Sequence, residues 1–305
     1  MFAVSVESLS KSFNGIKALK SLSFNVETGS LYGLIGPDGA GKTTFMRIAA
    51  CLLLQDSGSV SIGSFNNLNQ ANKIKRIIGY MPQRFSLYPD LSVKENLTFF
   101  ADLLGVSRKE RTGRIEKLLD FSRLGPFLNR RAGNLSGGMR QKLALSCTLI
   151  HTPEILFLDE PTTGVDPLSR REFWNLLAEI QSEGTTIVIS TPYMDEAERC
   201  DTVGLIMSGT LVIEGSPAEI PLNFKHNILA IRAPGIIKHG RKLIFPDTVL
   251  DVQTFGDRLH LIVLNVETAL PMVRDFLAEK GIHNVSIEPL PPSIEDVFME
   301  QIADE

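Results

Sequence analysis

The sequence predicts an α/β domain with a helical insertion, followed by a smaller α+β unit. Three observations lead to this prediction. A short apolar strand, a glycine-rich loop and a helix follow one another over residues 31–50. Residues 91–151 carry helical patterns and no strand pattern. After about residue 220 the order of strands and helices changes. We therefore expect a first domain over 1–220, with a helical subdomain over about 84–151, and an accessory domain over 221–305.

Two strands open the chain, over Val4–Leu9 and Leu22–Val26, with a turn at Asn14-Gly15 between them. Phe13 stands just before this turn. Its ring could stack on a nucleotide base. A place in the hydrophobic core is the alternative for this aromatic residue.

The glycine-rich loop follows the predicted buried strand Leu31–Ile35 and fits the pattern G-x-x-x-x-G-K-[ST]. Its backbone N–H groups and the start of the next helix should form a nest for phosphate. We expect Lys42 to reach the β- and γ-phosphates and the Thr43 hydroxyl to ligate Mg²⁺. The loop residues expected around the nucleotide are Gly36, Pro37, Asp38, Gly39, Ala40, Gly41, Lys42, Thr43 and Thr44.

The segment after the loop helix should return to the sheet before the helical insertion begins. We expect strands at Ser59–Ile62 and Ile77–Met81, with a polar helix at Asn69–Arg76 between them. Gln83 then stands at a strand end, where a polar surface residue is the ordinary interpretation.

Helix-start signals dominate the insertion. The capping boxes at Ser92 and Ser107 each predict a helix of about 12 residues. A third start, L-S-G-G-M over residues 135–139, offers free N–H groups, a hydroxyl and a helix dipole, which together suit an anion. A plain N-cap with a glycine turn is the alternative there.

Two carboxylates, Asp159 and Glu160, follow the apolar strand Ile155–Leu158. Ligand sites of open α/β sheets lie at this edge, and two acids there suit Mg²⁺ and a general base. Solvated acids after a strand are the alternative, which the upstream glycine loop disfavours. Asp166-Pro167 then predicts a helix start, and the helix should run to about Gln181.

The rest of the chain alternates strands with short helices. We expect a buried strand at Thr185–Ser190, a hairpin turning at Ser208-Gly209 and a capping box at Ser216. The accessory domain should contain strands near Ile228–Arg232, Val249–Thr254, Leu259–Leu264 and Asn284–Glu288, with helices near Ala269–Lys280 and after Ser293. Its expected role is structural or regulatory.

Composition narrows the function. Apolar residues are 43% and charged residues 22%, a globular mix, and the net charge of −4 does not favour nucleic acid as a partner. The three cysteines show no metal spacing and suggest a reducing compartment. An export-signal pattern and an apolar run of about 18 residues are both missing, so we expect a soluble chain.

Taken together, these motifs resemble the ATP-binding subunit of ABC transporters over residues 1–220. The glycine loop resembles the Walker A motif and Ile155–Glu160 the Walker B motif. Gln83 matches the Q-loop, Asp166 the D-loop and Phe13 the adenine-stacking position. The family signature corresponds to Leu135, Ser136, Gly137, Gly138 and Met139. The implied fold is a P-loop NTPase with antiparallel β and helical subdomains.

More narrowly, G-P-D-G-A-G-K-T-T, L-Y-P-D-L-S-V-K-E-N-L, Y-M-D-E-A-E and P-P-S-I-E-D-V-F resemble the ATPases of type-2 exporters for drugs, polyketides and polysaccharides. The resemblance implies a head-to-tail pair of ATPase domains, the same or different, with two ATP molecules between them. It also implies a membrane permease and a place on the cytoplasmic face of the cell membrane. Phe85, Leu87 and Tyr88 would dock the permease, unless they pack inside the helical subdomain.

The resemblance assigns roles within the ATP site. Lys42 and Gln83 would act with Glu160, which would polarise the attacking water. Thr43, Asp159 and Gln83 would hold Mg²⁺, and the signature would contact ATP bound by the partner's P-loop. Hydrolysis would therefore require the closed pair.

One departure from the family pattern is Pro192, which stands where the family carries a switch histidine. Proline offers no side-chain donor and no N–H. Thr191 or Tyr193 could donate instead. An asymmetric transporter, in which this site hydrolyses slowly beside a competent partner, is one hypothesis, and a homodimer that tolerates Pro192 is the other. A soluble ABC ATPase without a permease and a non-hydrolysing regulatory subunit are further alternatives.

Overall fold

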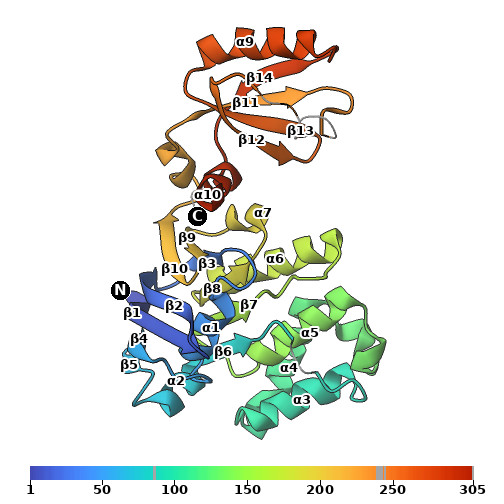
Figure 1. Ribbon diagram of the computed structural model, residues 1–305. Helices are drawn as coiled ribbons and strands as arrows, with labels where there is room; N and C mark the ends of the chain where they lie inside the picture. Colours follow the sequence, from blue (N-terminus) through green and yellow to red (C-terminus); the bar gives the residue numbers. More distant parts are fainter. Residues whose placement is uncertain (85–86, 238–242, 244, 304–305) are drawn as a thin grey trace. The chain divides into compact units, whose positions relative to one another are not determined.

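The computed structural model describes residues 1–84, 87–237, 243 and 245–303. The chain divides into two compact units, Met1–Ser216 (unit 1) and Pro217–Glu305 (unit 2), both drawn in Figure 1. Within unit 1 the strands are β1 (Phe2–Phe13), β2 (Ile16–Glu27), β3 (Leu31–Ile35), β4 (Ser57–Ile62), β5 (Phe65–Asn66), β6 (Ile78–Met81), β7 (Ile155–Asp159), β8 (Thr186–Thr191), β9 (Thr202–Met207) and β10 (Thr210–Gly215). Its α-helices are α1 (Lys42–Ala49), α2 (Ala71–Ile77), α3 (Val93–Leu103), α4 (Arg108–Ser122), α5 (Gly137–Leu149), α6 (Pro167–Ser182) and α7 (Met194–Ala197).

A mostly parallel sheet organises unit 1. Its strand order is β10-β9-β3-β8-β7-β6, and β10 is the antiparallel edge strand. Every residue of β3, β7 and β8 is buried, as expected for central parallel strands covered on both faces. The register pairs Ile35 with Thr191 and Asp159 with Ser190. The carboxyl ends of these three strands therefore lie side by side, and the candidate site is built there.

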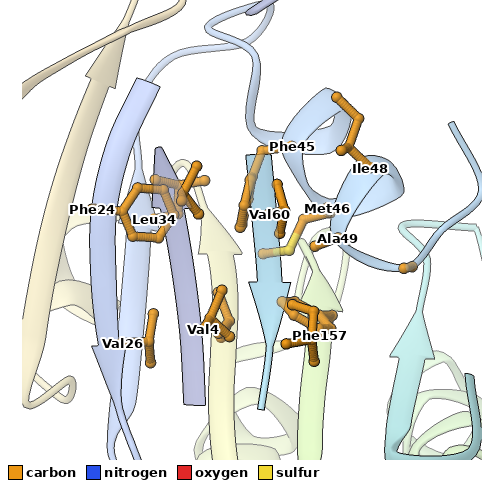
Figure 2. Close-up of a cluster of buried hydrophobic side chains, with 14 of the residues drawn as sticks. Val4, Phe24, Val26, Leu34, Phe45, Met46, Ile48, Ala49, Val60 and Phe157 are labelled. Carbon is orange, nitrogen blue, oxygen red and sulfur yellow. The ribbon is translucent and has the colours of Figure 1, made fainter. Parts of the chain in front are cut away.

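A second, antiparallel sheet has the order β2-β1-β4-β5. Helix α1 packs between the two sheets, and one cluster of buried side chains joins α1 to both (Figure 2). Phe45 of α1 lies edge-on to Phe24 of β2 and Phe157 of β7, with ring centroids 5.0 and 6.4 Å away. This apolar contact fixes the first turn of α1, which carries Lys42 and Thr43.

The segment between β6 and β7 is helical, as the sequence predicts. Helices α3, α4 and α5 share one hydrophobic core, which contains Val93, Leu119 and Leu143. The Ser92 hydroxyl accepts from the Glu95 amide, and the Glu95 carboxylate accepts from the Ser92 amide, which completes the predicted capping box.

Unit 2 is an antiparallel sheet of order β12-β13-β11-β14 with helices packed on it. Buried residues of β11 and β13, including Leu229 and Leu261, share a core with Val273 and Leu277 of α9. The elements of unit 2 are β11 (Asn227–Arg232), β12 (Val249–Phe255), β13 (Arg258–Val263), α9 (Val266–Glu279), β14 (Ser286–Leu290) and α10 (Ile294–Ala303).

The capping box predicted at Ser216 does not begin an α-helix. A turn follows it, and then a short 3₁₀ segment over Ile220–Asn223. Pro221 explains the difference, because it has no N–H to donate to a carbonyl one turn back. In the described part of the chain, no helix combines the length and the apolarity needed to cross a bilayer.

Candidate functional site

The glycine loop wraps the start of α1 at the carboxyl end of β3. At Gly36 and Gly41 a Cβ atom would lie only 2.1 Å from the Ile206 carbonyl oxygen and 2.5 Å from the Ala18 carbonyl oxygen, respectively. These two positions therefore require glycine, because the neighbouring backbone leaves no room for a side chain. The loop that the sequence predicts is thus fixed by backbone contacts on both sides.

Lys42 points back into this loop. It is 3% exposed, and its Nζ donates to the carbonyl oxygens of Gly36 (2.8 Å) and Pro37 (3.0 Å). The same Nζ lies 3.3 Å from Oε1 of Glu160. One buried cation is therefore held between the glycine loop and the carboxylate that follows β7. This position suits the neutralisation of a bound anion.

Asp159 is a buried carboxylate with one oxygen left over. Its Oδ1 accepts from the Thr43 hydroxyl (3.0 Å) and from the Ser190 hydroxyl (2.7 Å). Its Oδ2 is buried and has no hydrogen-bond partner. Burial raises the pKa of Asp159, and the hydrogen bonds from Ser190 and Thr43 oppose this effect.

The residues at Asp159 fit a hard cation. A hydroxyl and a carboxylate oxygen lie beside each other, and the unpartnered oxygen needs a positive charge. Mg²⁺ is commonly held by one or two such protein oxygens together with substrate phosphates and water. Thr43 and Asp159 therefore offer the types of oxygen ligand expected for Mg²⁺.

Glu160 joins Gln83 and Lys42 through its two carboxylate oxygens. Its Oε2 accepts from Nε2 of Gln83 (2.8 Å), while its Oε1 faces Lys42. Its backbone has a φ of 48°, in the left-handed region. Its N–H donates to the Ser190 carbonyl oxygen (3.1 Å) and to Oγ of the same residue (3.0 Å). The structure thus brings Lys42, Gln83 and Glu160 together from three elements far apart in the sequence.

Phe13 lies at the surface and not in the core, so the core interpretation is wrong. It ends β1, is 44% exposed, and has Nζ of Lys11 5.5 Å from its ring centroid. An exposed ring is available for stacking.

The predicted second anion site is a helix start, as expected. Ser136 caps α5, and its hydroxyl accepts from the Met139 amide (3.3 Å). A Cβ at Gly138 would meet Oγ of Ser169 at 2.2 Å, so this glycine lets α5 approach α6 closely. Asp166 caps α6 by accepting from the Ser169 amide, and this hydrogen bond lowers the pKa of Asp166.

Of the three residues expected to dock a permease, Phe85 lies outside the described residues. Leu87 is half-buried and packs against the helical core. Tyr88 is 45% exposed, with its ring edge-on to Phe99 at 4.5 Å. Leu87 therefore follows the packing alternative in part, while Tyr88 presents a surface.

The loop after β8 carries Pro192, which is half-buried. Thr191 cannot serve as its substitute donor, because its buried hydroxyl already donates to Oε2 of Glu196 at 2.6 Å. The guanidinium of Arg170 lies 5.1 Å from the ring centroid of Tyr193. Of the two substitutes that the sequence offered, Tyr193 is the one whose hydroxyl is not committed in this way.

Sequence reasoning missed Ser190 and Glu196. Ser190 is fully buried and holds both the Asp159 carboxylate and the Glu160 amide. A signal existed for Ser190, because residues near the carboxyl ends of two adjacent parallel strands lie side by side, and Asp159 pairs with Ser190. Glu196 offered none, because no local pattern shows that its carboxylate meets Thr162, 34 residues away, as well as the nearby Thr191.

These groups can position a polyphosphate and a water molecule. The loop amides and Lys42 suit the phosphates, Thr43 and Asp159 suit Mg²⁺, and Glu160 beside Gln83 suits a water-polarising base. The arrangement therefore fits phosphoryl transfer to water.

Comparisons with known proteins agree with this chemistry. A family model described as ABC transporter matches residues 19–163. The chain is 39% identical over 301 residues to the probable multidrug ABC transporter ATP-binding protein YbhF of Escherichia coli (strain K12), covering 97% of this chain and 51% of that protein. The chain thus spans about half the length of that relative.

Two further matches are nearly full-length for the other protein. The chain is 32% identical over 300 residues to Nod factor export ATP-binding protein I of Rhizobium etli, covering 98% of this chain and 93% of the relative. Among solved structures, the dimeric ATP-binding cassette MJ0796, in a post-hydrolysis state bound to ADP and Pi, matches with a TM-score of 0.64 and 28% identity. That match covers 70% of this chain and 98% of the other.

Proposed function

The chain belongs to the ABC transporter family, and from this premise we propose that it binds and hydrolyses ATP to drive export through a separate membrane permease. The names of its relatives support the export direction, since they include a multidrug transporter subunit and a Nod factor export subunit.

One observation carries the proposal. Glu160, which follows β7, contacts both Lys42 of the glycine loop (3.3 Å) and Gln83 of the segment after β6 (2.8 Å). An ordinary glycine turn does not require a buried lysine beside a carboxylate that also accepts from an amide. Such a group is suited to orient water against a phosphate, because phosphoryl transfer depends mainly on positioning and on charge stabilisation.

Thr43 and Asp159 would hold Mg²⁺, and Gln83 would approach it from the side of Glu160. The ion would supply positive charge to the phosphate oxygens. Phe13 would stack on the adenine, and the loop from Gly36 to Thr44 would enclose the phosphates.

A second ATPase domain completes this proposed unit. Ser136, Gly137 and Gly138 would contact ATP held by the partner, since they form a separate helix start with its own free amides. The dimeric state of the MJ0796 cassette supports this pairing. A permease would place the pair on the cytoplasmic face of a membrane, with Tyr88 at the contact.

Pro192 favours an asymmetric pair. The commitment of the Thr191 hydroxyl to Glu196 removes one replacement donor and so supports slow hydrolysis at this site. The partner would then be a different ATPase whose own site is competent. A homodimer that tolerates Pro192 is the competing assembly.

The test uses Glu160→Gln and the matched control Glu154→Gln, which changes an exposed acid just before β7. Affinity purification from mild detergent should bring along a membrane protein and an ATPase domain. With the companion's site silenced by the same Glu-to-Gln change, Glu160→Gln should keep ATP binding and lower the remaining hydrolysis by about 10²-fold or more, the contribution of a general base. Glu154→Gln should behave as wild type. A wild-type chain that binds no ATP, or that never enters membranes with a companion, would overturn the proposal.

A further inference from the structure

Glu196 is a buried acid that the proposed roles leave unexplained. It lies in α7 and is 1% exposed. Its Oε1 accepts from the Thr162 hydroxyl (2.7 Å) and its Oε2 from the Thr191 hydroxyl (2.6 Å). Nε of Arg170 lies 3.7 Å from Oε1. Each carboxylate oxygen therefore has its own hydroxyl donor, and a cation flanks the pair.

Each partner belongs to a different part of the ATP site. Thr162 stands two residues after Glu160, in the turn that leaves β7. Thr191 ends β8 and precedes Pro192. Arg170 lies one turn into α6, the helix that Asp166 caps. Glu196 therefore joins the water-polarising turn, the switch-position loop and the D-loop helix.

Further contacts tie the same loop to α6. The Tyr193 amide donates to Oγ1 of Thr191 (3.0 Å), so the Thr191 hydroxyl group serves both as donor and as acceptor. Arg170 is also paired with Asp195, and its guanidinium covers the Tyr193 ring. These contacts hold the loop on both sides of Pro192.

Burying a carboxylate is costly unless its oxygens are satisfied. Here the two hydroxyl donors are themselves buried, and they approach from two segments that are separate in sequence. The acid would lose a partner if the turn after Glu160 moved away from the loop at Pro192. A satisfied buried carboxylate thus makes the position of one segment depend on the position of the other.

We propose that Glu196 is a positioning residue, which couples the turn carrying Glu160 to the loop carrying Pro192 and so sets where Glu160 stands during hydrolysis. The coupling itself can be tested without hydrolysis, while its catalytic consequence rests on the proposed function. Glu196 does not touch the glycine loop in the contacts described, so its effect should fall on turnover and not on ATP affinity.

The first experiment measures amide hydrogen exchange in the full-length chain. Thr162→Val removes the donor on one segment while keeping its shape, and it should raise exchange across residues 190–196 on the other segment by several-fold. Thr162→Ser keeps the hydroxyl and should restore the wild-type pattern. The matched control is Thr148→Val, at a buried threonine whose hydroxyl bonds only to the Ala144 carbonyl oxygen of its own helix in the structure.

The second experiment measures ATPase kinetics in the assembled complex, with the catalytic glutamate of the companion ATPase domain replaced by glutamine so that only this chain's site turns over. Glu196→Gln should lower kcat by about tenfold or more with the KM for ATP unchanged, since displacing a catalytic group costs rate and not uniform binding. Thr162→Val combined with Glu196→Gln should cost little more than either change alone, because both remove one unit. Thr162→Ser, which keeps the hydroxyl donor, should have the kcat of the wild-type chain.

The outcomes separate the two proposals. If Thr162→Val alters exchange only around its own position, or if kcat of the Glu196→Gln complex equals that of wild type, the coupling is refuted and the ATPase proposal stands. If wild type hydrolyses no ATP in any complex, the function fails, while the exchange result still decides the coupling.

Discussion

Replacing Pro192 by histidine tests whether the missing side-chain donor limits hydrolysis. The surrounding backbone should tolerate the change. Thr191 pairs with Ile35 in the parallel sheet, and the Tyr193 amide is bonded to Oγ1 of Thr191, so neither neighbour depends on the proline ring. Pro192 is half-buried, which leaves an open side for an imidazole.

The size of the effect follows from what one donor contributes. Losing one preorganised donor to a charged transition state costs about 2.7–4 kcal/mol, or about 10²–10³ in rate. The full increase in rate would require the new imidazole to point directly at the developing charge, in a loop whose backbone now accommodates proline. We therefore expect kcat to rise by about 10- to 100-fold, with the KM for ATP unchanged because the ground state is bound by other groups. Proline restricts the unfolded chain, so replacing it should lower the free energy of unfolding by about 1 kcal/mol at most.

The assay is steady-state ATP hydrolysis by the purified complex, with the catalytic glutamate of the companion ATPase domain replaced by glutamine, so that the measured kcat belongs to this chain's own site. Pro192→Ala is the matched control, because it removes the ring without adding a donor. A rise in Pro192→His but not in Pro192→Ala identifies the donor as the limiting feature. An equal rise in both would assign the effect to loop relaxation, and a correctly folded Pro192→His complex with unchanged kcat would refute the reasoning.

Three more predictions follow from the contacts in each part of the chain. Tyr88→Glu should abolish co-purification with a membrane protein while ATP binding persists, whereas Tyr88→Phe should keep both co-purification and ATP binding; loss of ATP binding in Tyr88→Glu would contradict a docking role. Phe157→Ala should lower the free energy of unfolding by about 3–5 kcal/mol, read from denaturant midpoints at constant slope, because Phe157 is fully buried against α1. Burial alone would raise the pKa of Asp296, but hydrogen bonds with His260 and from Ser293 outweigh it and lower the pKa below 3.8. The stabilisation by Asp296 is therefore complete above the unfolded pKa and is lost as pH falls through the folded one. The difference in Tm between wild type and Asp296→Asn should accordingly shrink from pH 6 to pH 3, and a constant difference would refute this assignment.

Elements whose ends are marked by local chemistry could be predicted closely. The strand Leu31–Ile35 has its predicted bounds, because an all-buried apolar run stops at a glycine that the fold requires. The predicted start of α6 is also confirmed, since Asp166 caps it and Pro167 occupies its first turn. Where one short segment contains the whole cause of a boundary, the sequence is sufficient.

The first two strands show where local patterns fail. Each has 12 residues, about twice the length predicted. The pairing of β1 with β2 contains register shifts, and Ser8 and Ser21 have φ angles of 46° and 54°, in the left-handed region. These irregularities break the alternation of apolar and polar residues, so the pattern ends before the strand does.

Within the site, motif spacing predicts which residue types meet but not the buried contacts that position them. Gln83 and Glu160 are 77 residues apart in the sequence. Their contact could be expected, because they follow the carboxyl ends of β6 and β7, which are adjacent parallel strands. The contact between Thr162 and Glu196 depends on side chains leaving a turn and a short helix. Neither element has a periodicity that fixes these directions, so the partner of a buried acid cannot be found from the sequence in this case.

These contacts bear on how an ATP site can lack the switch histidine and still keep its switch loop in place. In the structure, Thr191 contacts Glu196 and Tyr193 contacts Arg170, and neither Glu196 nor Arg170 is among the residues proposed to bind ATP. Order in the loop therefore does not depend on a residue that contacts ATP. A proline at position 192 lacks a hydrogen-bond donor, but the contacts that hold the neighbouring residues Thr191 and Tyr193 in place remain. If both proposals hold, the site would bind nucleotide and close against a partner normally, and the defect would be confined to the chemical step.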